Sequence, residues 1–162
     1  MRELNLDLDS VAITERLGTA LATALVDQPG RCWVLLHGEL GAGKSTLARA
    51  LLRGAGVSTP IPSPTYTLVE PYIVAHERPA VHVDLYRLGS ADELDELGYS
   101  DWDTAIALIE WAERAPELAA KADLDVRLTV TGPASRAGLL TALSAVGQRL
   151  LRHSALAQVQ SE

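Results

Sequence analysis

The chain has 162 residues, of which 48% are hydrophobic, so it is long enough to bury a substantial core in a single domain. Its formal net charge of -7 argues against a protein that grips nucleic acid by itself, because such binding relies on many Lys and Arg contacts with phosphates. The N-terminal sequence MRELNLDLDS lacks the apolar segment of a signal peptide, and no apolar run reaches membrane length. We therefore expect one cytoplasmic domain over residues 1–162, without membrane contact, in which Cys32, the only cysteine, is a small core residue.

The N-terminal stretch reads as a strand, a helix and a second strand. Residues 4–8 alternate leucine with polar side chains, which predicts a short half-exposed strand. Asp9 or Ser10 can then cap a helix that runs to about Val26, with apolar residues along one face. Residues 32–36 form an apolar run, typical of a buried strand.

The next stretch, VLLHGELGAGKSTLARALL, contains the pattern G-x-x-x-x-G-K-S/T at residues 38–45. Its glycines allow backbone conformations that a side chain would forbid, so that N–H groups can converge on phosphate at the positive end of the following helix. Lys44 would supply a charge to the outer phosphates, and the Ser45 hydroxyl would ligate Mg²⁺. The alternative is a glycine-rich turn without a ligand, but the strand before it and the helix after it, ending near Gly54, favour phosphate binding. The expected nucleotide-binding residues of this loop are Glu39, Leu40, Gly41, Ala42, Gly43, Lys44, Ser45 and Thr46.

A proline-rich segment and a hairpin follow. Residues 55–64 contain three X-Pro steps and are predicted to be extended and irregular. Residues 65–74 predict a strand, which Pro71 confines to a sheet edge or a bulge. The connection to a second strand at residues 81–86 is so short that the two strands must be antiparallel.

The remaining elements are expected from capping signals and periodicity. In chain order they are a capped helix that ends at Gly98, a strand over residues 105–109, a brief helix at Pro116, a strand over residues 124–130, an amphipathic helix over residues 137–151 and a frayed tail over residues 154–162. The fold class is therefore α/β, a three-layer sandwich of the P-loop NTPase type whose mixed sheet has a parallel core and an antiparallel hairpin.

Two acids end apolar strands, where ligands bind in open α/β sheets: Asp84 in VHVDLY and Glu110 in IALIEW. Either can organise Mg²⁺ and either can polarise the attacking water, so together with Lys44 they are the candidate catalytic residues. With Ser45 they are also the candidate metal ligands. Acids at strand ends can equally serve as helix caps or solvated residues, and the sequence leaves open which acid has which role.

Two further features are open to more than one interpretation. Ser63-Pro64-Thr65 places hydroxyl groups on a stiff segment, where Ser63 and Thr65 would meet the γ-phosphate or Mg²⁺ in a switch, or would take part in ordinary loop contacts. Trp111, beside Glu110, would pack near the nucleotide or in the core.

Other motifs carry less weight. Residues 95–98 match D-x-x-G but lie inside the capped helix, and because no N-K-x-D occurs, ATP is favoured over GTP. Arg136 is expected at the surface, although transition-state stabilisation is an alternative. The four histidines, which lack metal-ligand spacing and are expected in solvated or packing roles, are His37, His76, His82 and His153.

Taken together, the blocks GELGAGKST, SPTYTLVEPY, VDLYRL, DELDELGY and IEWAER resemble the TsaE family, formerly called YjeE, of P-loop ATPases in bacterial tRNA threonylcarbamoyladenosine synthesis. The resemblance covers about residues 38–114, with serine at Ser45 where the family often has threonine, and alanine at Ala112 where it often has proline. The site residues that it implies are Lys44, Ser45 and Thr46 at the phosphates and magnesium, Asp84, Glu110 and Trp111 near the nucleotide, and Ser63 and Thr65 in a mobile segment.

The resemblance also implies a function. It is that of a small, weak ATPase with ATP/ADP and Mg²⁺ as cofactors, which acts with a TsaB–TsaD heterodimer. In that system TsaD transfers the threonylcarbamoyl group to tRNA, and ATP binding and hydrolysis by TsaE reset the complex. The tRNA would then be held mainly by the partners, which agrees with the acidic balance of this chain. There are two competing hypotheses: a small-molecule P-loop kinase, and a module that binds nucleotide without hydrolysing it.

Overall fold

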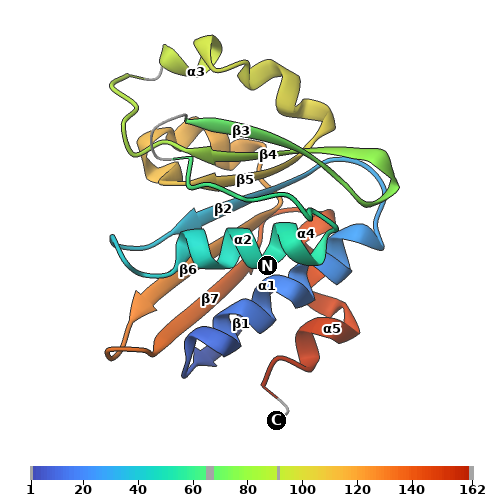
Figure 1. Cartoon of the computed structure of the whole chain (residues 1–162), viewed down its shortest axis with the longest axis vertical. Coiled ribbons are helices and arrows are strands. Elements are labelled where there is room, and N and C mark those ends of the chain that lie inside the picture. Colours follow the sequence, from blue (N-terminus) through green and yellow to red (C-terminus); the bar gives the residue numbers. More distant parts are fainter. Residues whose placement is uncertain (1, 65–67, 91, 161–162) are drawn as a thin grey trace.

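A seven-stranded mixed sheet forms the centre of the computed structural model, which describes residues 2–64, 68–90 and 92–160 (Figure 1). The strands are β1 (Glu3–Leu8), β2 (Cys32–His37), β3 (Val69–Val74), β4 (Arg78–Asp84), β5 (Ile106–Glu110), β6 (Leu124–Val130) and β7 (Arg136–Ala142). The helices are α1 (Val11–Val26), α2 (Lys44–Gly54), α3 (Glu93–Glu96), α4 (Ala145–Arg152) and α5 (Ser154–Ala157). Four 3-10 turns are η1 (Ala75–Glu77), η2 (Tyr99–Thr104), η3 (Ala112–Arg114) and η4 (Pro116–Ala120).

The strand order is β1-β7-β6-β2-β5-β4-β3. The four inner strands β6, β2, β5 and β4 run parallel, whereas β7 and β1 on one side and β3 on the other are antiparallel to their neighbours. This confirms the expected parallel core and the hairpin of β3 and β4. Because the inner strands are parallel, β2, β5 and β4 all end at the same edge of the sheet, and this edge carries the candidate site.

The sheet is buried on both faces, which makes three layers. Along β2, Cys32, Val34 and Leu36 face the helices α1, α2, α4 and α5, whereas Trp33 and Leu35 face α3 and the 3-10 turns. Such alternation follows from the two-residue period of a strand, and apolar residues on both faces explain the continuous apolar run in the sequence. Figure 1 shows α1 and α2 on one face of the sheet.

The expectation of a helix over residues 137–151 is wrong in its first half, because residues 136–142 form β7 between β1 and β6. The buried residues of β7 are Gly138, Leu140 and Ala142, a two-residue period that alanine and leucine, both good helix formers, conceal. The helix α4 begins only at Ala145, where the Ser144 hydroxyl accepts a hydrogen bond from the Gly147 N–H at 3.2 Å.

The expectation of a frayed tail from residue 154 is also wrong as far as residue 160. Residues 154–157 form α5, which packs on α1, and Leu156 and Val159 are 2% and 1% exposed. The Gln160 side chain donates to the Asp7 carbonyl on the edge strand β1 at 2.7 Å. The C-terminal segment therefore completes the core on the α1 side.

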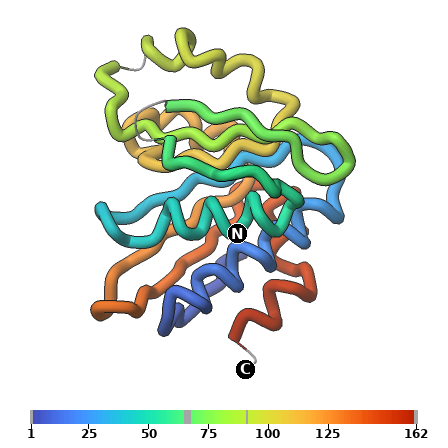
Figure 2. The backbone as a smooth tube through the Cα atoms, in the orientation of Figure 1, coloured from blue at the N-terminus to red at the C-terminus, as the bar shows by residue number. Residues whose placement is uncertain are grey.

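The region between α2 and β4 differs in its boundaries from the prediction. Residues 55–64 are irregular, as expected, and run back from the end of α2 toward the edge where β2 ends (Figure 2). The strand β3 begins at Val69, with Pro71 on the edge of the sheet, and residues 65–67 of the expected strand lie outside the described residues. No helix among the described residues is long and apolar enough to cross a membrane.

Candidate functional site

The phosphate loop connects the end of β2 to the first turn of α2 and depends on glycine at two positions. A Cβ atom on Gly38 would lie 2.7 Å from the Leu128 carbonyl oxygen and 2.9 Å from the Ala42 Cβ. Gly43, the residue before α2, has φ 105°, a left-handed conformation that side chains disfavour. The sequence pattern therefore matches a backbone path that only glycine takes without strain.

Lys44 turns its ammonium group back onto the loop. The side chain is buried, and its Nζ donates to the Glu39 carbonyl at 3.0 Å and to the Gly38 carbonyl. The same Nζ lies 4.2 Å from the centre of the Trp111 ring, a cation–π contact. Burial lowers the pKa of Lys44, although the nearby carboxylates of Glu110, Glu113 and Asp84 oppose this shift.

Arg136 holds the outer side of the loop. Its Nε donates to the Ala42 carbonyl at 3.1 Å and its Nη2 to the Gly41 carbonyl at 3.0 Å. The other terminal nitrogen donates to the Gly132 and Ser135 carbonyls of the connection between β6 and β7. Because the C=O and N–H of one peptide unit point in opposite directions, this grip aims the Gly43 N–H away from Arg136. Arg136 is thus half-buried against the loop, a contact that the expectation of a surface arginine did not include.

The two acids lie at strand ends, as the sequence predicts, and the structure places them side by side. Asp84 and Glu110 are paired in the parallel register of β4 and β5 and are 3% and 2% exposed. The Ser45 hydroxyl donates to Glu110 at 2.9 Å (Oε1) and 3.2 Å (Oε2). Asp84 Oδ1 accepts the Tyr86 N–H at 2.9 Å.

A histidine completes this arrangement. His82 is fully buried, and its Nε2 lies 2.6 Å from Glu110 Oε2. The carboxylate of Glu110 therefore has Ser45 on one side and His82 on the other. The expected packing role of His82 omitted this contact with a candidate catalytic residue.

These groups surround a cavity of about 230 Å³, here called the phosphate-loop pocket. It is lined by Leu40, Gly41, Gly43, Lys44, Ser45, Thr46, Asp84, Tyr86, Glu110 and Trp111. The donor set is one hydroxyl and two carboxylates, hard oxygen ligands that suit Mg²⁺. The described residues contain no cluster of three or more His, Cys, Asp or Glu side chains that could hold a metal ion.

Trp111 covers one side of this pocket from a strained position. Its φ of 57° is left-handed, which for a bulky residue costs about 1–3 kcal/mol. The centre of the ring lies 4.9 Å from the centre of the Tyr86 ring, and the ring contacts Lys44, the first residue of α2. Trp111 thus lines the phosphate-loop pocket and also packs against the core cluster on the Trp33 side of the sheet, so the structure does not decide between the two interpretations that the sequence left open.

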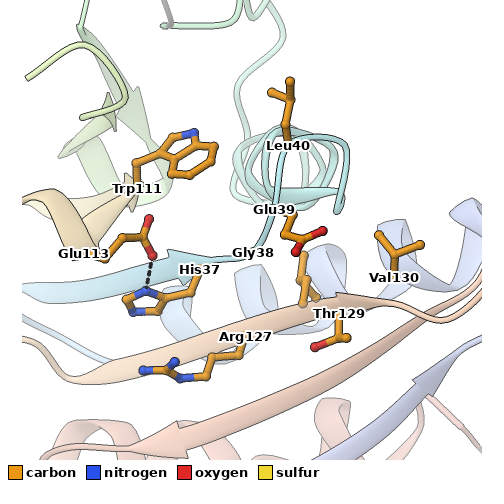
Figure 3. Close-up of a pocket in the computed structure, with 10 residues that line it drawn as sticks. His37, Gly38, Glu39, Leu40, Trp111, Glu113, Arg127, Thr129 and Val130 are labelled. Carbon is orange, nitrogen blue, oxygen red and sulfur yellow. Dashed lines mark hydrogen bonds and ion pairs between the residues drawn. The ribbon is translucent and has the colours of Figure 1, made fainter.

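A second cavity of about 740 Å³, here called the lateral pocket, lies beside the loop (Figure 3). Glu39 and Leu40 line it, and Leu40 is 80% exposed. At its base, His37 Nδ1 lies 3.0 Å from Glu113 Oε2, and His37 Nε2 lies 2.6 Å from Asp125 Oδ1. These carboxylates, Asp125 foremost, raise the pKa of His37 against the opposing effect of its partial burial.

The structure brings together most of the expected site residues but leaves others apart. Ser63 is exposed and lines neither pocket, and Thr65 lies outside the described residues. Sequence reasoning missed His82 and Arg136. His82 could have been found from its spacing, since a residue two positions before Asp84 on a strand shares its face. Arg136 could not, because its role depends on where β7 lies.

A glycine loop between a parallel strand and a helix, with two acids at the ends of the neighbouring strands, defines a P-loop protein. The sequence profile of the family "Threonylcarbamoyl adenosine biosynthesis protein TsaE" matches residues 8–137, most of the chain. The chain belongs to the TsaE family, as its motifs suggested.

Individual relatives agree with this assignment. The chain is 44% identical to the tRNA threonylcarbamoyladenosine biosynthesis protein TsaE of Haemophilus influenzae over 97 residues, which span 59% of this chain and 61% of that protein. It is 39% identical to the protein of the same description from Mycobacterium tuberculosis over 131 residues, 74% of this chain and 73% of that protein. The crystal structure of Bacillus subtilis YdiB has the same fold, with a TM-score of 0.70 at 23% identity over 92% of this chain and 91% of that chain.

Proposed function

We propose that this protein binds ATP, hydrolyses it weakly and is required for threonylcarbamoyladenosine modification of tRNA, as a nucleotide switch on a TsaB–TsaD complex. The observation that carries the proposal is the convergence of Lys44, Ser45, Asp84 and Glu110 on one pocket beside a glycine loop. Membership of the TsaE family supports the biological role.

The chemistry follows from where these groups lie. Lys44 would leave the loop carbonyls and place its charge on the outer phosphates of ATP, a charge-assisted contact in a partly buried site. The Ser45 oxygen and one of the two acids would hold Mg²⁺, which neutralises charge on the phosphates when bound. The other acid would orient the attacking water. Ser63 and Thr65, in the proline-rich segment after α2, would contact the γ-phosphate and lose this contact on hydrolysis.

The partners would carry the tRNA. With a net charge of -7, this chain has little electrostatic attraction for a polyanion, whereas a switch subunit needs contact only with proteins. A cytoplasmic location would follow from such a role.

Nucleotide binding is tested by Lys44→Ala, with calorimetric titration of ATP and Mg²⁺. We expect roughly 100-fold weaker binding, about 3 kcal/mol, because the buried ammonium contact is lost. The control is Lys121→Ala, which removes the chain's other lysine, on the surface beside Asp103. Equal ATP affinity in the Lys44 variant and the unmodified protein would contradict the loop assignment.

The biological role is tested by mixing the chain with purified TsaB–TsaD and separating the mixture by size. We expect co-elution that depends on whether ATP or ADP is present. Failure to co-elute in every nucleotide state would contradict the proposed switch.

The competing functions are separated by turnover. A kinase would transfer phosphate to a metabolite, so phosphate release measured with and without candidate acceptors would reveal it. For the proposed ATPase, Glu110→Ala should abolish turnover and leave ATP binding intact. The reason is that Glu110 is one of the two acids that line the pocket and could polarise the attacking water. No turnover in the unmodified protein, even with TsaB–TsaD, would favour a binding module.

A further inference from the structure

We propose that His82 is a positioning residue that fixes the carboxylate of Glu110, so that one chosen oxygen faces the phosphate-loop pocket. This inference rests on the proposed ATPase function, and it assigns the chain a functional histidine that its motifs did not indicate.

The sheet places His82 where it can act on Glu110. Ala80 packs on the helix α2 face of β4, and the two-residue period of a strand puts His82 and Asp84 on that same face. In the parallel register His82 lies opposite Leu108 and Asp84 opposite Glu110, so His82 and Glu110 are diagonal neighbours on adjacent strands. Figure 1 shows β4 and β5 side by side within the sheet.

The two oxygens of Glu110 have different surroundings. Oε2 lies 2.6 Å from His82 Nε2, whereas the Ser45 hydroxyl is nearer to Oε1, at 2.9 Å, than to Oε2, at 3.2 Å. His82 is 0% exposed and Glu110 2%, so no bulk water competes for the shared hydrogen bond. Ser45, Glu110 and His82 therefore form a continuous chain of contacts that begins at the half-buried Ser45, in the first turn of α2, and ends at the fully buried His82.

A purely structural role does not account for this histidine. Its Nδ1 is buried and has no hydrogen-bond partner among the described residues. Buried polar atoms are nearly always paired, and an apolar side chain at this position would leave no such atom in the core. The histidine thus introduces an unpaired nitrogen, and what it gains in return is the hydrogen bond to Glu110.

The consequence concerns the orientation of the carboxylate. A glutamate side chain rotates freely about its last torsion, so an unrestrained carboxylate presents either oxygen. With Oε2 held by the Nε2–H of His82, Oε1 remains on the Ser45 side, where the chemistry takes place. Because reactions are sensitive to displacements well below the size of an atom, loss of this restraint should slow turnover and leave ATP binding largely unchanged.

The test compares His82→Met with His82→Gln. Both side chains are unbranched and similar in size, but only the glutamine amide can donate from near the position of Nε2. We expect the Met variant to turn over ATP at least tenfold more slowly with TsaB–TsaD present, the Gln variant to recover most of the rate, and both to bind ATP within about twofold of the unmodified chain. A matched control is Ile106→Val, which removes one methyl group from the opposite end of β5.

Thermal unfolding accompanies each variant, and the Met and Gln variants are compared at equal folded fractions. Met turnover within twofold of the unmodified chain, or Gln turnover as slow as Met, would overturn the role of His82 alone. Absence of ATP binding or turnover in the unmodified chain would overturn the proposed function, and this inference with it.

A second readout does not depend on activity. Nitrogen-15 NMR of the nucleotide-free protein should show the His82 imidazole with its proton on Nε2 and a bare Nδ1, and Glu110→Ala should shift the Nε2 signal. The opposite tautomer would overturn the proposal, because His82 would then have no proton to donate to Glu110.

Discussion

Two cationic side chains hold the phosphate loop through its backbone. Lys44 donates to the Gly38 and Glu39 carbonyls from inside the loop, and Arg136 donates to the Gly41 and Ala42 carbonyls from outside. Carbonyls carry only partial charge, so both cations retain positive potential that an anion can use. In the proposed function, Arg136 would keep its hold on the loop while Lys44 leaves the carbonyls for the phosphates, which would reduce the ordering cost of binding.

Arg136→Met tests the outer grip. The variant should fold, because the guanidinium is only half-buried, but the loop carbonyls lose their donors and the loop conformation becomes less well defined. We expect ATP binding to weaken roughly tenfold, about 1.4 kcal/mol, as measured by calorimetric titration. Arg152→Met, at an exposed position in α4, is the control. Unchanged affinity would mean that the loop keeps its shape without Arg136.

Gly38→Ala tests the close approach of the loop to β6. The added methyl would lie 2.7 Å from the Leu128 carbonyl, a backbone atom that cannot move aside easily. Gly30→Ala is the matched control, because Gly30 also has a positive φ, 87°, but nothing lies within 4 Å of its Cβ position. We expect the Gly38 variant to lose about 1–3 kcal/mol more stability than the Gly30 variant in urea unfolding. Equal losses would show that only backbone strain matters.

At the scale of elements, the parts predicted correctly are those whose signal is local. The phosphate loop, the strand before it, the helix after it and the hairpin at β3 and β4 follow from residue spacing, turn residues and Pro71. The placement of Asp84 and Glu110 at strand ends also followed, whereas their pairing in adjacent strands became visible only in the structure.

The parts that were missed depend on distant partners. Residues 136–142 contain only a weak two-residue period, and they become a strand because β1 and β6 offer edges on either side. The contacts of His82 and Arg136 likewise join segments far apart in the chain. A single sequence carries no direct record of such contacts. For residues 136–142, the prediction therefore relied on local helix propensity, which gave the wrong secondary structure.

The C-terminal segment gives an element-scale prediction. Deleting residues 154–162 exposes the surface that Leu156 and Val159 cover on α1, at about 1.5–3 kcal/mol for each buried side chain. We expect the free energy of unfolding in urea to fall by about 3–6 kcal/mol, whereas deleting only residues 161–162 should have little effect. If both truncated chains are as stable as the full chain, the segment does not contribute to the core.

At the scale of the whole molecule, acidic residues dominate, and His37 joins two of them across the sheet edge. It links Glu113, on the turn after β5, with Asp125 on β6, and Asp125 also contacts Arg127 at 3.2 Å. Because His37 immediately precedes Gly38, this cluster ties the start of the phosphate loop to the strands on both sides of β2.

The cluster predicts a dependence of stability on pH. The carboxylates of Asp125 and Glu113 raise the pKa of His37 in the folded protein above its ordinary value of 6.5. A group with a raised folded pKa adds its full stabilisation below the unfolded pKa and loses it as the pH rises through the folded pKa.

Between about pH 6 and pH 8, the unmodified chain should therefore lose more stability than His37→Gln, whose side chain does not titrate. Urea unfolding of both proteins across this range measures the difference directly. The contact of His153 with Asp27 is present in both proteins, so it does not contribute to the difference between them. Parallel curves for the two proteins would show that folding does not raise the pKa of His37, and would contradict this prediction.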